Sequence, residues 1–303
     1  MLSLKPLLLT AAALGAAGSS AFTQQPGCDT TAQALLQSAE SDAEQEFWQA
    51  IAVIANQSSN HAALLQQAIA QREEALELGE AQFAARMNVC SVLGTAIYQP
   101  VLSPSEFSPS VTNTYFPLII GRKLIYEQVV GTDVERTEVL TEAGSQDING
   151  FACRIVRDTV TLNGVFLEDT TDWYSQRNDG SVWYMGEISL NYDEQGFLEN
   201  LDGSWRFGFD RALPGIVMLA NPMVGDAYRQ EYLIGEAEDV ARVISVGVTV
   251  SVPAGTFTNC IVTEDWVPLD PEAIEQKFYA PGVGLVLEVD PATGVKTELI
   301  AIM

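Results

Sequence analysis

The fold is decided by the stretch FPLIIGRKLIYEQVVGTDVERTEVL at residues 116–140, which returns in a related form as NPMVGDAYRQEYLIGEAEDVARVIS at residues 221–245. Both stretches alternate apolar with polar residues and are interrupted by Gly and Asp, a pattern typical of antiparallel strands joined by turns. The features that follow come in the same order in both parts, and Cys153 matches Cys260. The sequence therefore predicts two tandem repeats of one strand meander.

The two repeats span about 115–202 and 221–303, and each supplies about five or six strands. Two copies of a meander pack as a curved antiparallel sheet, a sandwich or a barrel. The domain at 115–303 is therefore predicted to be mainly β, and the chain as a whole α+β, with a helical hairpin in front of the sheet.

Residues 28–98 are rich in Ala, Gln, Glu and Leu and contain no Pro, which predicts a helical hairpin. A run of turn formers at 57–60 separates its two helices. The second helix repeats apolar residues at the spacing of an interhelical seam: Leu65, Ile69, Leu76, Phe83, Met87 and Cys90.

The four cysteines predict two disulfides, because exported chains keep cysteines paired. Cys28 begins the first helix and Cys90 ends the second, so the two meet at the open end of the hairpin. Cys153 and Cys260 occupy equivalent strand positions, which would come close together at a pseudo-two-fold axis. They also form the pair that remains, and we expect the bridges Cys28–Cys90 and Cys153–Cys260.

The segment at 99–114 is predicted to be a linker. It contains Pro100, Pro104 and Pro109 among repeated Ser residues, and prolines at this density block both helices and strand pairing.

The beginning of the chain predicts a signal peptide at 1–21. Lys5 precedes an apolar stretch at 7–17 that is too short to span a bilayer, and small residues up to Ala21 form a cleavage site. No later stretch is apolar enough for a transmembrane segment. We therefore expect an exported protein, periplasmic or extracellular.

The formal charge of −25 comes from 15 Lys plus Arg against 40 Asp plus Glu. Such a field repels nucleic acids and anionic membranes, which excludes both as partners. His61 is the only histidine, which excludes Ser-His-Asp and Cys-His nucleophiles and His-based zinc or copper sites. We expect no cofactor, apart from Ca²⁺ as an option.

Several motifs resemble a widespread family of exported bacterial proteins with no assigned activity: LEDTTDWYSQ, VWYMGE, PGIVMLA, YRQEYLIGEAED and KFYAPGVGLVLE. The stretch RMNVCSVLG at 86–94 resembles the N-terminal extension of that family. More loosely, YAPGVG at 279–284 is similar to small exported domains curved like the lipoprotein carrier LolA. That likeness implies a hollow apolar binding surface.

Carboxylates are the first candidates for chemistry. Glu168 and Asp172 share a face of their strand, whereas Asp169 points to the other face. Such a pair could act as acid and base in glycoside hydrolysis; the alternative is a solvated acidic face.

A second candidate site loosely follows a calcium loop, with Asn191, Asp193, Gln195 and Asp202 as ligands. The alternative is a hairpin turn, because the repeat aligns residues 193–196 with residues 291–294.

The third candidate is the connection at 203–220, which has no counterpart in the second repeat. Together with rings from the first repeat it predicts a ligand-binding surface made of Trp205, Arg206, Asp210, Arg211, Trp173 and Trp183. The alternative is a further buried strand, with Trp205 plugging one end of a barrel.

The leading functional hypothesis is a non-enzymatic extracytoplasmic module that binds an apolar or polymeric ligand or a protein of the cell envelope. The alternative is a carboxylate-dependent hydrolase acting on an extracellular polymer. An apolar cavity with few polar groups would favour binding, and a concave site with a carboxyl of raised pKa would favour hydrolysis. A third option is a Ca²⁺-stabilised surface protein.

Overall fold

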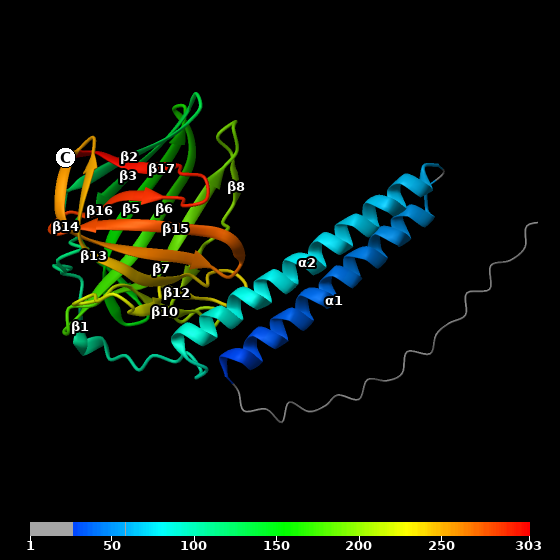
Figure 1. Cartoon of the computed structure of the whole chain (residues 1–303), viewed down its shortest axis with the longest axis horizontal. Coiled ribbons are helices and arrows are strands. Elements are labelled where there is room, and N and C mark those ends of the chain that lie inside the picture. Colours follow the sequence, from blue (N-terminus) through cyan, green and yellow to red (C-terminus); the bar gives the residue numbers. More distant parts are fainter. Residues whose placement is uncertain (1–26, 58) are drawn as a thin grey trace, which may run out of the picture.

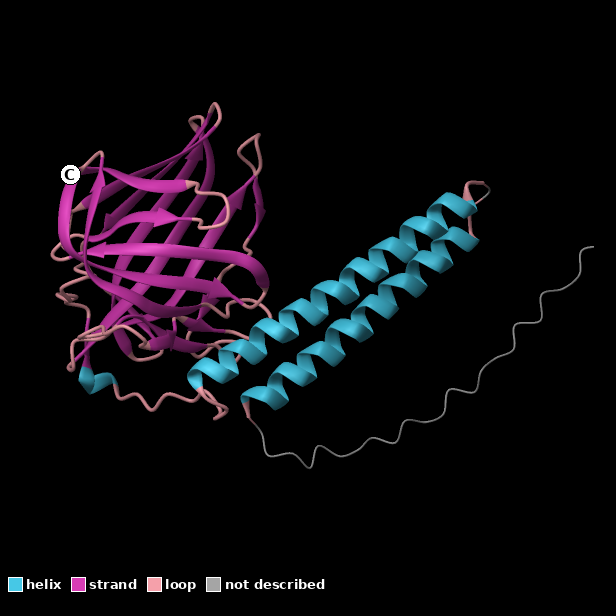
Figure 2. Cartoon of the chain, viewed as in Figure 1, coloured by secondary structure: helices cyan, strands magenta, loops and turns pink. Residues whose placement is uncertain are grey.

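The computed structural model describes residues 27–57 and 59–303, which form a long helical hairpin and a nearly closed antiparallel barrel (Figure 1). Figure 2 shows the two helices projecting away from the strands. The predicted class, mainly β with a helical hairpin in front, is confirmed. The predicted signal peptide at 1–21 lies outside the described residues.

The hairpin consists of α1 (Cys28–Ala55) and α2 (His61–Leu93), separated at the predicted run of turn formers. Cys28 and Cys90 are disulfide-bonded with their Cα atoms 5.6 Å apart, so the predicted first bridge is confirmed. A bridge between residues 62 apart in sequence stabilises the hairpin by about 4 kcal/mol on the loop-entropy account.

Small residues form the contact between the two helices. Ala43 and Ala68 are buried there, whereas Leu65 and Met87 of the predicted seam are 38% and 37% exposed. A Cβ added to Gly79 would lie 3.0 Å from a Cβ of α1, so the helices approach too closely for large side chains between them. The predicted seam is therefore wrong in part, because the helices pack through an Ala-rich face and not through the Leu-rich one.

Seventeen strands are described. Their bounds are β1 (Phe107–Ser108), β2 (Lys123–Val130), β3 (Asp133–Thr141), β4 (Gln146–Ile148), β5 (Phe151–Leu162), β6 (Val165–Arg177), β7 (Val182–Tyr192), β8 (Leu198–Asn200), β9 (Trp205–Arg206), β10 (Leu213–Met218), β11 (Ala227–Arg229), β12 (Glu231–Tyr232), β13 (Val240–Val252), β14 (Gly255–Val267), β15 (Asp270–Ala280), β16 (Gly284–Val289) and β17 (Lys296–Ile302).

The barrel closes at two places. The last strand, β17, pairs with β2, and Leu299 lies opposite Tyr126. On the other side β10 pairs with both β7 and β12, and β11 pairs with β13. Between these joints the strands pair antiparallel mostly in chain order, although β3 pairs with β5 and the short β4 also pairs with β5. Closure leaves few free strand edges.

The predicted linker at 99–114 contains secondary structure, which corrects the expectation that its prolines block helix and strand pairing. The segment forms a short 3-10 helix, η1 (Pro104–Glu106), and β1 pairs with β6. Pairing is possible because the prolines flank this two-residue strand and do not interrupt it. The ring of Phe107 packs edge-on against Phe151 at 5.1 Å, so the segment is held against the barrel.

Cys153 and Cys260 are both free and buried, so the predicted second disulfide is wrong. Cys153 lies on β5 in a cluster with Trp173 and Met185, whereas Cys260 lies on β14 in a separate cluster around Leu299. β5 pairs with β3, β4 and β6, and β14 pairs with β13 and β15. The two strands therefore lie apart in the sheet and do not pair with each other.

A close backbone contact fixes the connection at 203–220 against β7. Gly186 on β7 has a φ of 133°, and a Cβ there would lie 2.6 Å from the Trp205 carbonyl oxygen. Only glycine permits this approach. Trp205 on β9 is thereby held against the barrel.

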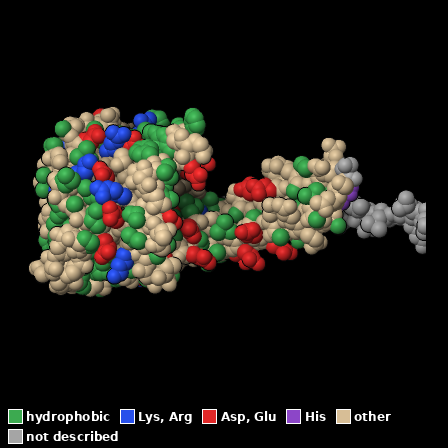
Figure 3. Space-filling view, turned by 90° about the horizontal axis from the view of Figure 1, so that it is seen from above, with side chains coloured by type: hydrophobic (Ala, Val, Ile, Leu, Met, Phe, Trp, Pro, Cys, Tyr) green, Lys and Arg blue, Asp and Glu red, His purple; other side chains and the backbone are tan. Residues whose placement is uncertain are grey.

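Charged side chains are unevenly distributed over the outer surface. Figure 3 shows acidic side chains along the hairpin, and a row of mixed basic and acidic side chains on the barrel. Within residues 27–57 and 59–303, no helix combines the length and the apolar character that a membrane crossing requires.

Candidate functional site

One face of β5, β6 and β7 carries carboxyl groups into the barrel. Asp158 on β5 lies opposite Thr170 on β6, and Asp172 on β6 lies opposite Glu187 on β7. Alternate residues of a strand share a face, and diagonal partners across an antiparallel pair lie about 7–8 Å apart. Asp158 therefore has Asp172 and Glu168 as its two diagonal neighbours.

A cavity of about 270 Å³ lies between this face and the wall formed by β15 and β16. Its apolar lining includes Phe116, Leu118, Leu124, Val139, Val156 and Leu285, and its polar lining includes Tyr126, Asp158, Tyr174, Lys277 and Tyr279. An apolar wall with a few convergent polar groups is typical of small-molecule sites.

Burial raises the pKa values of the carboxyls on this face, and repulsion between them adds to the effect. The pKa of Asp172 rises to about 7, although the Tyr184 hydroxyl donates a hydrogen bond to Asp172 Oδ1 and opposes the rise. The pKa values of Asp158 and Glu187 also lie well above the ordinary range. Asp172 is therefore partly protonated at neutral pH.

Asp158 also has an unsatisfied oxygen. Its Oδ1 is shielded from solvent and has no hydrogen-bond partner. A buried acceptor without a donor is costly, and this one belongs to a side chain that lines the cavity.

Lys277 projects from the opposite wall into a group of three carboxylates. Its Nζ lies 3.1 Å from Glu275 Oε2, and 3.7 Å from both Asp265 Oδ2 and Glu288 Oε2. Burial alone would lower the pKa of Lys277, but these carboxylates raise it above the ordinary value. The ammonium group is therefore charged and is already matched by carboxylates.

Aromatic rings complete the interior. Tyr174 and Tyr184 are stacked, with ring centroids 4.7 Å apart, and burial raises the pKa of both hydroxyls. The Tyr126 hydroxyl donates a 3.0 Å hydrogen bond to the Leu285 carbonyl oxygen. These rings give the cavity rigid walls.

The predicted residues of the connection at 203–220 do not line this cavity. Trp205 is 3% exposed and packs edge-on against Tyr184 at 5.3 Å, a position that fits the alternative in which it plugs one end of the barrel. The Arg206 guanidinium lies 3.6 Å from the ring centroid of Phe209. The two other residues, Asp210 and Arg211, are exposed and adopt positive φ angles of 48° and 69°.

Trp173 and Trp183 lie in a different cluster from the cavity. Both pack with Phe151 and Met185, and Trp183 Nε1 donates a 3.0 Å hydrogen bond to Ser181 Oγ. The structure therefore does not bring these two rings together with Trp205 in one surface.

The predicted carboxylate pair, Glu168 and Asp172, shares the inner face. Asp169 points the other way and forms an ion pair with Arg157, as expected from strand alternation. Glu168 Oε1 accepts a 2.6 Å hydrogen bond from Thr170 Oγ1. Neither carboxyl of the predicted pair is among the residues that line the cavity.

The four predicted calcium ligands lie in and around the β7–β8 hairpin. Asp193 Oδ1 accepts hydrogen bonds from the backbone N–H groups of Gln195 and Phe197. Asn191 Nδ2 donates to Asn200 Oδ1 and to the Asp202 carbonyl oxygen. These bonds are those of a side-chain-capped turn. Across residues 27–57 and 59–303, no three His, Cys, Asp or Glu side chains are grouped to hold a metal ion.

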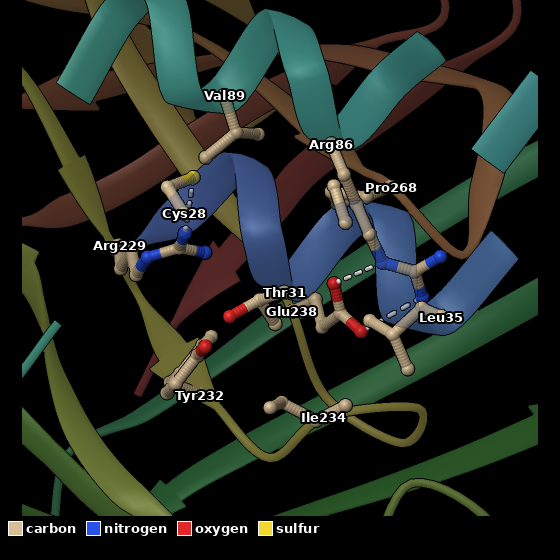
Figure 4. A pocket seen from close by; sticks show the side chains of 11 residues that line it. Cys28, Thr31, Leu35, Arg86, Val89, Arg229, Tyr232, Ile234, Glu238 and Pro268 are labelled. Atoms are coloured by element: carbon tan, nitrogen blue, oxygen red, sulfur yellow. Dashed lines mark hydrogen bonds and ion pairs between the residues drawn. The ribbon is translucent and has the colours of Figure 1, made fainter. Parts of the chain in front are cut away.

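A second cavity lies where the hairpin joins the barrel (Figure 4). Arg86 of α2 donates two 2.8 Å hydrogen bonds to Glu238, from Nε to Oε2 and from Nη2 to Oε1. Beside them Arg229 lies over the ring of Tyr232, 4.6 Å from its centroid. With a volume of about 20 Å³ this space holds about one water, so the junction is a structural contact.

No family model, no curated protein and no solved structure matches the chain. The family resemblance and the LolA-like likeness therefore stay predictions.

Sequence reasoning did not single out Asp158, Lys277 or Tyr126. A usable signal was present: Asp158 stands between Val156 and Val160, on the apolar face of an alternating strand. A charged residue at such a position points into the protein.

Proposed function

We propose that the chain is a non-enzymatic binding module of an exported protein, and that it holds a compact, partly apolar ligand inside the barrel. The observation that carries this proposal is the 270 Å³ cavity with its apolar wall and few polar groups. The size favours a small molecule over a polymer chain. Export is supported by the N-terminal leader pattern and by the disulfide.

The test is calorimetric titration with a neutral probe, hexanol, together with native mass spectrometry for a co-purified molecule. Hexanol should bind, and Val139→Phe should abolish binding because Val139 lines the cavity. Val129→Phe is the matched control, since Val129 is 59% exposed on β2. If no small apolar or amphipathic probe binds the wild-type protein, or if both variants act alike, the proposal fails.

A carboxylate-dependent hydrolase is the second candidate, favoured by the pKa of Asp172, which is near 7 beside other carboxyls. Both catalytic carboxyls of a hydrolase must reach the substrate, and of the inner-face carboxyls Asp158 is the one that lines the cavity. Release of reducing sugars from a cell-wall polymer, lost in Asp172→Asn, would favour this candidate over binding.

A further inference from the structure

We propose that the ligand of the barrel cavity carries an organic ammonium group, which pairs with Asp158 while its apolar part contacts the apolar side chains that line the cavity. This inference rests on the proposed binding function and specifies the chemical class of the ligand.

The first step is the position of the unsatisfied acceptor. Asp158 Oδ1 is shielded from solvent and has no hydrogen-bond partner, and its side chain lines the cavity. An ammonium group placed there would donate a charge-assisted hydrogen bond, which is stronger than a bond between neutral groups. The structure thus has an unsatisfied acceptor on a side chain that lines the cavity.

The second step is the balance of charge around that acceptor. The groups that act on Asp158 are carboxyls, namely Asp172, Glu168 and Glu187. The cations that line the cavity are already engaged. Lys277 is paired with three carboxylates, and the Arg122 guanidinium donates to the carbonyl oxygens of Pro117, Gly282 and Val283. The inner face therefore gathers carboxyl groups that the described cations of the lining do not pair with.

The third step separates an organic cation from a metal ion. Among the described residues, no group of three or more His, Cys, Asp or Glu side chains could hold a metal ion. Val139, Val156 and Leu124 also line the cavity next to Asp158, and their apolar side chains cannot coordinate a metal ion. An alkylammonium ion uses both parts, since its charge meets the carboxyl and its chain contacts the apolar wall.

Proton linkage gives this pairing a signature. Several groups face Asp158: Thr170 and Val139 across the neighbouring strands, Glu168 and Asp172 on the diagonals, then Glu187, with Tyr126, Tyr174 and Lys277 around the same cavity. Burial and these carboxyls raise the pKa of Asp158, which favours the protonated form of the acid. Binding of an ammonium ion favours the ionised carboxyl and releases the proton, and its affinity therefore rises with pH.

The experiment compares hexylamine, hexanol and hexanoate by calorimetry on the full chain. The three probes share one carbon chain and differ in charge. Hexylamine should bind at least about tenfold more tightly than hexanol, and hexanoate should bind weakest. The advantage of hexylamine should grow as the pH rises through the range in which the amine itself stays protonated.

Asp158→Asn should remove the tenfold preference for hexylamine over hexanol and the pH dependence of that preference. The matched control is Asp42→Asn, because Asp42 is exposed on α1 and its loss changes the net charge equally. Thermal melting of both variants checks that each remains folded. If Asp158→Asn unfolds, the pH dependence of hexylamine binding to the wild-type protein, measured against hexanol, carries the test.

The outcomes separate the two proposals. If hexanol binds as well as hexylamine, or if Asp42→Asn lowers hexylamine affinity as much as Asp158→Asn does, the ammonium inference is overturned and the binding function stands. If none of the three probes binds, the binding function itself fails. Preferred binding of hexanoate would also overturn the inference and would point to Lys277.

Discussion

The buried ion pair at the junction gives the sharpest stability prediction. Arg86 and Glu238 have side chains only 9% and 3% exposed, and they are joined by two hydrogen bonds of 2.8 Å. Arg86→Ala leaves the Glu238 carboxylate buried, with a single remaining hydrogen bond of 2.9 Å from the Gly235 N–H. Removing one partner of such a pair costs about 3–5 kcal/mol, which corresponds to a fall in Tm on the order of 10 °C.

Urea unfolding followed by circular dichroism measures this loss. Arg72→Ala is the matched control, because Arg72 pairs with Glu44 at side-chain exposures of 36% and 43%, and an exposed pair contributes about 1 kcal/mol or less. The double variant Arg86→Met with Glu238→Leu should recover most of the loss, since no charge is left buried. A cost for Arg86→Ala no larger than that for Arg72→Ala would refute the reasoning.

Three further predictions concern the barrel. Gly186→Ala should destabilise the protein by about 2–4 kcal/mol in urea titrations, because the new Cβ would lie 2.6 Å from a backbone oxygen. The control Gly196→Ala, in an open turn with nothing within 4 Å of the new Cβ, should cost only about 1 kcal/mol. Equal losses of stability in the two variants would contradict the packing argument. Cys153 and Cys260 are buried thiols, and burial raises the pKa of both. A thiol reagent should therefore label them only in denaturant. Rapid labelling of the native protein would contradict the barrel as described. The pKa of Asp172 is raised to about 7, so the folded state binds this proton more tightly than the unfolded chain does. Thermal stability should therefore fall as the pH rises from about 4 towards 7, and this pH dependence should be weaker in Asp172→Asn. An unchanged pH dependence in the variant would show that other groups cause it.

Local patterns were enough to predict the hairpin and the β class. The Pro-free, Ala-rich stretch and the turn formers at 57–60 define both helices, and the positions of Cys28 and Cys90 define their bridge. These features depend on neighbours within one turn or one hairpin, which sequence periodicity reports directly.

Closure of the sheet could not be predicted in the same way. The expectation of a Cys153–Cys260 bridge assumed that equivalent strands meet at an axis, whereas the observed joints at β2–β17 and β7–β10 keep β5 and β14 apart. Which strand edges pair depends on the packing of the whole chain, and the alternation within one strand does not record it. The tandem repeat itself stays a prediction.

The candidate site was missed for a related reason. Trp205 attracted attention because aromatic and cationic residues are conspicuous in a loop, yet it is buried under Tyr184. The cavity instead depends on residues from β2, β3, β5, β6, β15 and β16. Each contributes one or two inward side chains, and only the closed barrel brings them together.

The joint between β2 and β17 also sets the order in which the barrel can form. Thr297 Oγ1 donates to Gln128 Oε1 across 169 positions of sequence, and β17 follows every other strand in the chain. During synthesis β2 therefore keeps one open edge until residues 296–302 are available. Such long-range closure is slow compared with hairpin formation. Until then, the unpaired edge of β2 can pair with a wrong strand of the same chain or of another chain.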